Sequence, residues 1–303
     1  MKPKKKSTLS TFLNNDNTVG YVFALPFIIG FCFLTLVPMA LSLYYSFCDY
    51  KIGGKAVLVG LENFLNLFKD KTFGNSILVT LQYVIIGVPL KLIFALLIAM
   101  LLTKPTKLQG VYRAVYYIPS LIGGSVAVAL VWKQLFGSRG PIVSAIKAMG
   151  ATGFNFFGST AWAFLPLVLC NAWQFGSSML IFASGLKQIP NDYYESAQID
   201  GAGAFKRFIS ITLPCLSPII LFNLLMQLIS GFMTFTQAQI ITQGGPNHAT
   251  EYVSLFIFTE GFSYGHMGYA CAASWIILLI MVAVTGIIFK TSKAWVFYGD
   301  GDE

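Results

Sequence analysis

Six long apolar runs dominate the pattern of hydrophobic and polar positions along the chain. Segments that contain polar residues, glycine or proline separate them, and each run reaches the length of about 20 helical residues that crosses a bilayer core about 30 Å thick. We therefore predict an all-α membrane protein with six transmembrane helices. The runs span residues 20–47, 74–103, 114–135, 161–186, 214–241 and 269–290.

The first run is too long for the apolar core of a signal peptide, and no cleavage site with small residues follows it. We expect it to be retained as an extra N-terminal transmembrane helix after a tail of residues 1–19. A loop, residues 48–71, follows it. Within that loop, residues 61–71 carry apolar side chains at helical spacing, which predicts a short helix that lies at the outer membrane surface or packs on the protein itself.

The composition agrees with a chain whose solvent is lipid. Charged residues make up 11% of the 303 residues and hydrophobic residues 56%, whereas a soluble domain carries about 25% charged residues. So few charges cannot cover a water-facing surface, which excludes an ordinary soluble enzyme, a disordered chain and a nucleic-acid-binding domain.

The distribution of lysine and arginine predicts the orientation. With the N-terminus inside, the inner segments hold 12 basic residues and the outer segments 7, and an excess of Lys and Arg marks cytoplasmic loops. We therefore expect both termini, including the tail of residues 291–303, in the cytoplasm. The net charge of +8 is then a topology signal and not a sign of nucleic-acid binding.

The sequence lacks the residues that ion coupling, catalysis and metal binding usually require. None of the six runs contains Asp or Glu, whereas ion-coupled transporters usually need ionisable groups at membrane depth. No GxxxxGK[ST], GxSxG or HExxH motif occurs, so we expect no catalytic residues and no ATP hydrolysis by this chain. Five scattered cysteines and two isolated histidines predict no disulfide framework and no metal site. Lys91 is the one charged side chain near a membrane midplane, and such a lysine more often faces a wet cavity or a carbonyl than forms a functional site.

The segment 187–213, between the fourth and fifth runs, carries the most specific pattern. Asp192 and Glu195 are spaced as a capping box, which predicts a helix that begins at Asp192. Ala197, Gly201 and Ala204 would leave a small, flat face that another protein could approach closely, and Gly201-Ala-Gly203 permits a sharp turn. The pattern alone fits a docking element and a surface helix without a partner equally well.

This segment resembles the EAA loop of permease subunits in binding-protein-dependent ABC importers. The family pattern is E-A-A, three residues, G, nine residues, I-x-L-P, and this chain keeps both spacings with one departure, Ser196 in place of the first alanine. The resemblance implies a coupling helix that docks on an ATPase subunit, within a type 1 ABC transmembrane domain over residues 72–290. The expected coupling residues are Glu195, Ser196, Ala197, Asp200, Gly201, Ala204, Ile211, Leu213 and Pro214.

Two further stretches resemble the larger permease subunit of the maltose and glycerol-phosphate type. Residues 242–250 resemble the TxGGPxxxT segment of carbohydrate importers, and Leu25-Pro26, Val37-Pro38 and Ser46-Phe47 resemble that subunit's first span. The resemblance implies import of a di- or oligosaccharide across the bacterial cytoplasmic membrane by ATP-driven alternating access. It also implies a second permease, an ATPase dimer that binds ATP and Mg, and an extracytoplasmic sugar-binding protein as partners, with no cofactor bound by this chain.

Polar residues form a stripe on the fifth run and a smaller set on the fourth. Amide and hydroxyl groups both donate and accept hydrogen bonds, which suits a neutral sugar, but they can equally join helices to one another. The candidates for the substrate pathway are Asn223, Gln227, Ser230, Thr234 and Gln237 on the fifth run, and Asn171, Gln174 and Ser178 on the fourth.

Three rivals belong to other classes. An ion-coupled secondary transporter of a small polar solute is the main alternative, although the acid-free runs disfavour it. A membrane-embedded enzyme lacks clustered catalytic groups, and a channel would not need the docking loop.

Overall fold

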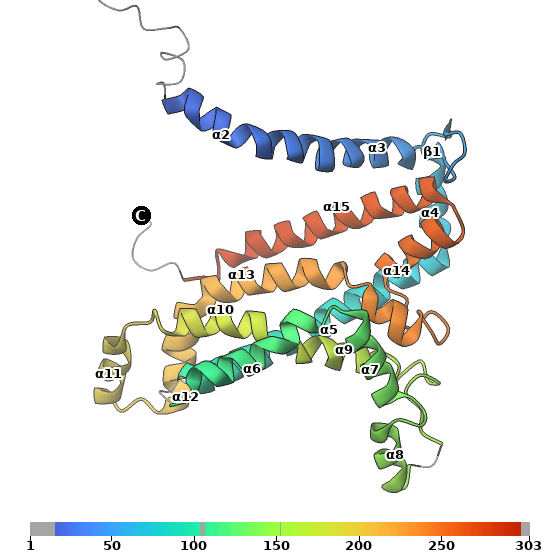
Figure 1. Ribbon diagram of the computed structural model, residues 1–303. Coiled ribbons are helices and arrows are strands. Elements are labelled where there is room, and N and C mark those ends of the chain that lie inside the picture. Colours follow the sequence, from blue (N-terminus) through green and yellow to red (C-terminus); the bar gives the residue numbers. More distant parts are fainter. Residues whose placement is uncertain (1–15, 104–106, 152, 298–303) are drawn as a thin grey trace, which may run out of the picture. The chain divides into compact units, whose positions relative to one another are not determined.

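The computed structural model describes residues 16–103, 107–151 and 153–297, and helices account for most of these residues (Figure 1). The expected tails of residues 1–19 and 291–303 therefore lie partly outside the described residues. The chain divides into two compact units. Unit 1 comprises Met1–Leu65 and Glu260–Trp275, and unit 2 comprises Asn66–Thr259 and Ile276–Glu303.

Unit 1 contains one long apolar helix and the loop that follows it. The helix consists of α2 (Asp16–Phe31), a π-helical turn η1 (Cys32–Leu36) and α3 (Val37–Ser46), and it is long and apolar enough to span a membrane. A two-stranded antiparallel sheet, β1 (Cys48–Asp49) with β2 (Val57–Leu58), follows.

The loop of unit 1 is tied to the end of α3 by a single asparagine. Asn63, in α4 (Glu62–Lys69), donates from Nδ2 to the carbonyls of Ser46 and Cys48 at 3.0 and 2.9 Å, and the Phe64 ring contacts the Phe47 ring at an angle of 47°. The expected surface helix is therefore present. One side of α4 is covered by the protein, with Phe64 against Phe47 and Leu67 buried, whereas Phe68 is 75% exposed.

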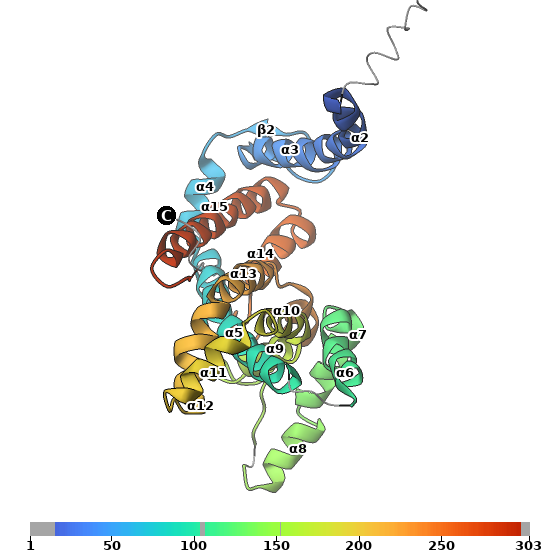
Figure 2. The same cartoon turned by 90° about the vertical axis from the view of Figure 1, so that its left-hand side faces the viewer.

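Unit 2 is built around α5 (Lys71–Thr103), its longest helix, which packs against α9 (Phe164–Trp173), α10 (Gly176–Leu186) and α13 (Leu213–Phe232) (Figures 1 and 2). Its buried face includes Ala95 and Ala99, both fully covered. Small side chains let neighbouring helices approach closely, which is how helices associate when lipid removes the hydrophobic drive between them.

Two of the six expected spans are broken. The run 114–135 divides into α6 (Gln109–Ile122) and α7 (Val126–Phe136), and α7 leads into α8 (Pro141–Ala148); the two halves of this pair are bent by 95°. The run 161–186 divides into α9 and α10, bent by 43°. Continuous helices were expected here because both stretches are apolar throughout. A hydropathy pattern does not detect a helix break, such as the one at Gly123-Gly124 after α6.

The fifth expected span is displaced toward the N-terminus. A continuous helix, made of α12 (Ala204–Arg207), η2 (Phe208–Thr212) and α13, runs from Ala204 to Phe232, and it begins ten residues before the predicted start at 214. It also ends nine residues before 241, because the chain turns at Met233 and resumes as η3 (Ala238–Thr242). Pro214 lies directly after the π-helical turn η2 within this continuous helix, and it has no N–H to donate to the preceding turn.

The remaining elements complete the chain. The helices α14 (Val253–Phe258) and η4 (Thr259–Ser263) precede α15 (Met267–Ser292), which agrees with the last predicted span. After α15, Val296 is buried and the Phe297 N–H donates to Ser217 Oγ at 2.8 Å. The C-terminal end of the described chain is thereby fastened to the start of α13.

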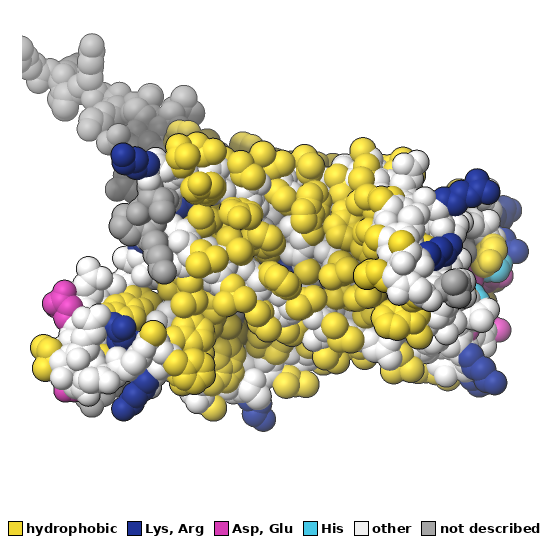
Figure 3. Space-filling view, turned by 90° about the horizontal axis from the view of Figure 1, so that it is seen from below, with side chains coloured by type: hydrophobic (Ala, Val, Ile, Leu, Met, Phe, Trp, Pro, Cys, Tyr) yellow, Lys and Arg dark blue, Asp and Glu magenta, His cyan; other side chains and the backbone are white. Residues whose placement is uncertain are grey.

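The surface agrees with a membrane environment. In Figure 3, hydrophobic side chains cover the broad middle of the face, and charged side chains gather at its two ends. Among the described residues, four helices are long and apolar enough to cross a membrane, and the count rises to six if each bent pair is one span.

Candidate functional site

The helix of the cytoplasm-assigned loop, α11 (Asn191–Ile199), begins differently from the prediction. Pro190 occupies the N-cap, with ψ 137°, and no side chain caps the helix. A capping box needs an N–H on the N-cap residue, and proline has none, so the predicted pairing of Asp192 with Glu195 does not form. Asp192 instead lies in the first turn, where its negative charge favours the helix dipole.

The end of α11 explains Gly201. Its φ is +73°, its N–H donates to the carbonyl of Gln198 at 3.0 Å, and the Ala202 N–H donates to the carbonyl of Ala197 at 2.8 Å. This pair of bonds is the Schellman motif that closes many helices. Gly201 therefore terminates the helix. The expected flat helical face of Ala197, Gly201 and Ala204 does not exist, because Ala204 begins the separate helix α12.

The exposed residues of α11 leave it available to a partner. It has no buried residue, and Ile199 is 88% exposed. A side-chain hydrogen bond connects it to the bundle, since Tyr194 Oη and Thr212 Oγ1 are 2.9 Å apart. Thr212 is buried and directly precedes α13, so this bond connects α11 to the helix that contains α13.

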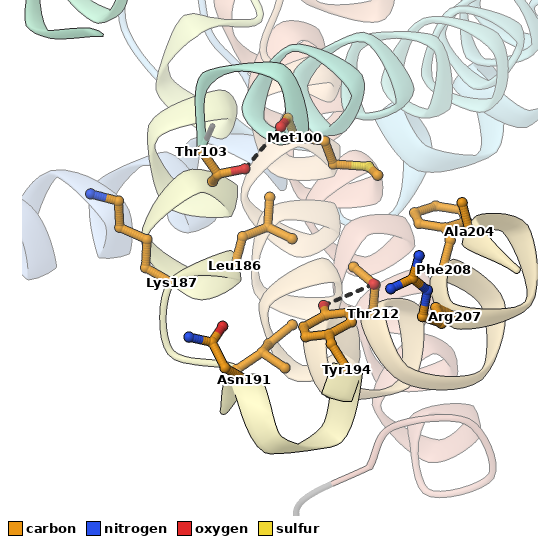
Figure 4. A pocket seen from close by; sticks show the side chains of 11 residues that line it. Met100, Thr103, Leu186, Lys187, Asn191, Tyr194, Ala204, Arg207, Phe208 and Thr212 are labelled. Atoms are coloured by element: carbon orange, nitrogen blue, oxygen red, sulfur yellow. Dashed lines mark hydrogen bonds between the residues drawn. The ribbon is translucent and has the colours of Figure 1, made fainter. Parts of the chain in front are cut away.

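A pocket of about 770 Å³ lies between α11, α12 and the ends of α5 and α10 (Figure 4). The Tyr194–Thr212 pair lies at its base, with Lys187 and Arg207 on opposite sides in the view of Figure 4. The rest of its lining is mixed, with apolar side chains such as Met100 and Leu186.

A second pocket, of about 440 Å³, gathers most of the expected coupling residues. Its lining combines α11, the start of α13 and the C-terminal segment, and it comprises Tyr193, Ser196, Ala197, Asp200, Ser210, Ile211, Pro214, Cys215 and Phe297. Glu195, Gly201 and Ala204 are exposed outside it, and Leu213 is partly buried in the first turn of α13.

The two broken spans are joined to each other at their breaks. Ser120 Oγ donates to the carbonyl of Gln174 and accepts from the Ser177 N–H, both at 3.0 Å, and the Gln174 side chain packs against Gly123. Gln237 Nε2 donates to the Gly123 carbonyl at 3.3 Å. Irregular backbone at membrane depth must find its hydrogen bonds within the protein or in a wet cavity. These side chains supply them, and we call Ser120, Gly123, Gln174, Ser177 and Gln237 the break cluster.

The predicted polar stripe of the fifth run is not one helical face. Because α13 ends at Phe232, Thr234 lies beyond it on irregular chain, and Gln237 lies in the short helical segment that leads into η3. Asn223 is buried and donates to the Ile219 carbonyl of its own helix, while its Oδ1 has no partner. Ser230 is exposed and its carbonyl accepts from Thr234 Oγ1.

Two candidates from different runs contact each other. Gln227 Nε2 donates to Ser178 Oγ at 3.1 Å, and Ser178 is fully buried. This bond joins α13 to α10, which is the interhelix role that the sequence left open for both residues.

The other two candidates of the fourth run lie on α9 and at its end. Gln174 belongs to the break cluster. Asn171 Oδ1 is 3.5 Å from Lys91 Nζ, and Lys91 is 6% exposed. Asn171 thus lies beside Lys91, and Gln174 and Gln237 lie in the break cluster. The sequence analysis did not single out Ser120 or Gly123, for which the Gly-Gly pair was the available signal.

The histidines of the outer segment, set aside in the sequence, each have an acidic partner. His248 contacts Glu251, and His266 Nδ1 is 2.9 Å from Glu260 Oε2. Asn75 Nδ2 donates to the His248 carbonyl at 2.9 Å, which ties the TQGGPNHAT segment to the start of α5. Among the described residues, no group of three or more His, Cys, Asp or Glu gathers as metal ligands would.

Comparison with known proteins gives a consistent result. A relative in Bacillus subtilis (strain 168), the probable ABC transporter permease protein YesP, is 46% identical over 97% of this chain and 96% of its own. The trehalose/maltose transport system permease protein MalF of Thermococcus litoralis is 30% identical over 91% of this chain and 94% of its own.

The fold agrees as well. A chain of the crystal structure of a bacterial alginate ABC transporter, in complex with an alginate pentasaccharide-bound periplasmic protein, superposes with a TM-score of 0.79 at 22% identity, covering 94% of this chain and 97% of the other. Residues 56–297 match the family described as binding-protein-dependent transport system inner membrane component. The chain therefore belongs to this family of ABC importer permeases.

Proposed function

We propose that this chain is one permease subunit of an ABC importer that moves a di- or oligosaccharide into the cell, with α11 as the contact for a separate ATPase subunit. The observation that carries the proposal is the α11 loop: an exposed helix, closed by Gly201 and connected through Tyr194 to the buried Thr212. The names of the relatives support a carbohydrate, since they include permeases for starch degradation products and arabinooligosaccharides.

The long helix that contains α13 suggests how the loop acts. Ala204–Phe232 is a continuous helix of 29 residues, about 43 Å long at 1.5 Å per residue. If the closing ATPases displace α11, the displacement would act on this long helix at Thr212. It would then move Gln227 relative to Ser178 on α10. ATP binding thus biases one of two helix packings, which is the requirement for alternating access.

The partners follow from this mechanism. ATP and Mg would be bound by the ATPase subunits, a second permease would complete the pathway, and an extracytoplasmic binding protein would deliver the sugar. The comparisons give no support to the ion-coupled alternative.

A matched pair of substitutions tests the ATPase contact. Ile199→Arg places a charge on α11, where the native side chain is 88% exposed, and Met149→Arg places the same charge after α8, where the native side chain is 80% exposed. Neither change disturbs a core, so both variants should reach the membrane.

We expect Ile199→Arg to lower copurification of the ATPase subunit and sugar uptake at least tenfold, and Met149→Arg to leave copurification at the wild-type level. Normal ATPase recovery with Ile199→Arg would contradict the assignment of α11 as the contact.

A further inference from the structure

Lys91 is a buried lysine for which the described part of the chain supplies no acidic partner. Its side chain is 6% exposed, and it lies twelve residues before the end of α5 at Thr103, about 18 Å along the helix axis. None of the six spans carries Asp or Glu, and no ion pair to Lys91 forms within residues 16–103, 107–151 and 153–297. An ionisable group at this depth is costly, and proteins retain such groups where they serve a function.

The contacts of Lys91 leave most of its hydrogen-bonding capacity unused. The ammonium has three donors, and the described residues supply one acceptor, Asn171 Oδ1, at the long distance of 3.5 Å. The Asn171 amide nitrogen in turn lies against the backbone of Gly87, where an added Cβ would approach it to 3.1 Å. Asn171 is thus held between α9 and α5 with its oxygen directed at the ammonium.

Lys91 also adjoins the polar groups that interrupt the bundle. Asn171 lies one turn before the α9–α10 break, and Gln174 of the break cluster donates to the carbonyl of Cys170, the neighbour of Asn171. Amide donors and acceptors therefore lie beside a single positive charge. Neutral hydroxyl-rich ligands can accept hydrogen bonds from both the amides and the ammonium, but only an anion such as a carboxylate also neutralises the charge of an unpaired ammonium.

We propose that Lys91 and Asn171 form a subsite for the carboxylate of an acidic oligosaccharide, with the ammonium pairing with the anion and the amide contacting a neighbouring hydroxyl. This inference rests on the proposed function and specifies its substrate class. Because none of the six spans carries Asp or Glu, no carboxylate within them competes with the substrate for Lys91.

The test uses the complete importer with its binding protein in proteoliposomes. The probes are trisaccharides of uronic acids and the same trisaccharides with each carboxyl reduced to an alcohol, so that each pair differs in charge alone. Wild-type importer should take up at least one uronate trisaccharide, and at least tenfold faster than its reduced counterpart.

Two variants that alter the charge at this site in different ways keep the result interpretable. Lys91→Met removes the charge, and Asn171→Asp leaves Lys91 in place but supplies it with an internal counter-ion, which favours the folded bundle. Both should lower uronate uptake at least tenfold, Lys91→Arg should retain more than a third of it, and Ile93→Met, at a 56% exposed position on the same helix, should retain all of it.

Each outcome bears on one claim. Uptake of the reduced trisaccharides alone overturns the carboxylate subsite and leaves the proposed function intact, as does uronate uptake that neither Lys91→Met nor Asn171→Asp diminishes. If no mono-, di- or oligosaccharide is imported by an assembled, ATP-hydrolysing complex, the proposed function itself fails.

Discussion

At the scale of the residue, position 201 requires glycine although no neighbouring side chain would contact a larger residue there. A Cβ at this position would meet nothing within 4 Å, yet its φ is +73°. Holding an L-residue in that region costs about 1–2 kcal/mol, so the demand for glycine comes from the backbone alone. Gly203 offers the matched comparison, since a Cβ there also meets open space but φ is −64°.

Gly201→Ala should therefore weaken the α11 loop where Gly203→Ala does not. If α11 must be closed to engage the ATPase, the strain of about 1–2 kcal/mol should lower the affinity between permease and ATPase about 5- to 30-fold. Titration of the purified ATPase subunit onto each permease variant measures this. Equal affinities for the two variants would show that the Schellman turn is dispensable.

The spacing from Glu195 to Pro214 predicted the loop, but it could not predict the residue that caps α11. The capping box failed because Pro190, two residues earlier, takes the N-cap and has no N–H to offer. The prediction that the polar residues of the fifth run share one helical face was wrong for a related reason. The spacing of Asn223 to Gln237 is helical in sequence, whereas the turn at Met233 is set by tertiary contacts, such as the hydrogen bond that Ser254 donates to the Thr234 carbonyl.

At the scale of the element, the two bent spans depend on glycines that admit the backbone of a neighbour. A Cβ at Gly176 would come within 2.8 Å of Tyr117 Cα and 2.9 Å of Ser120 Oγ, and also into the Tyr116 carbonyl. A Cβ at Gly124 would meet nothing within 4 Å. Backbone atoms cannot rotate out of the way, so the two glycines should respond very differently to the same methyl group.

We expect Gly176→Ala to destabilise the bundle by about 1–3 kcal/mol, the usual cost of overpacking, and Gly124→Ala to have little effect. Thermal unfolding of the purified complex in detergent, followed by the fraction that remains monodisperse, measures both. Similar melting temperatures for the two variants would mean that α6 and α10 do not meet at the distance seen here.

The bond between α13 and α10 permits a second prediction at this scale. Gln227→Leu leaves the buried hydroxyl of Ser178 without its partner, which should cost about 1 kcal/mol of bundle stability and leave the apparent affinity for sugar unchanged. Ser178→Ala should rescue part of the loss, because it removes the orphaned group. A change in sugar affinity with unaltered stability would instead place Gln227 in the pathway.

At the scale of the whole molecule, the distribution of charge divides unit 2 into two ends. One end carries α11 and α12 with Asp192, Glu195 and the basic pair Lys206-Arg207, and Figure 3 shows charged side chains at both ends of the apolar middle. The segment after α15 is fastened to this same end by the bond from Phe297 to Ser217. The proposed ATPase contact and the described segment after α15 therefore share one end of unit 2. If the ATPase binds α11 in the cytoplasm, that segment lies on the cytoplasmic side, as the count of Lys and Arg predicts.

This orientation can be tested with reporters that are active on one side only. A green fluorescent protein fused after Glu303 should fluoresce, and alkaline phosphatase at the same position should be inactive, because the former folds in the cytoplasm and the latter needs an oxidising compartment. Phosphatase inserted after Met149, an exposed residue beyond α8, should be active. Because α11 and Phe297 share an end of the bundle, an active phosphatase after Glu303 would move α11 outside as well, away from ATP. That single result would overturn both the orientation and the role assigned to α11, whereas loss of activity at Met149 alone would question only the path of α7 and α8.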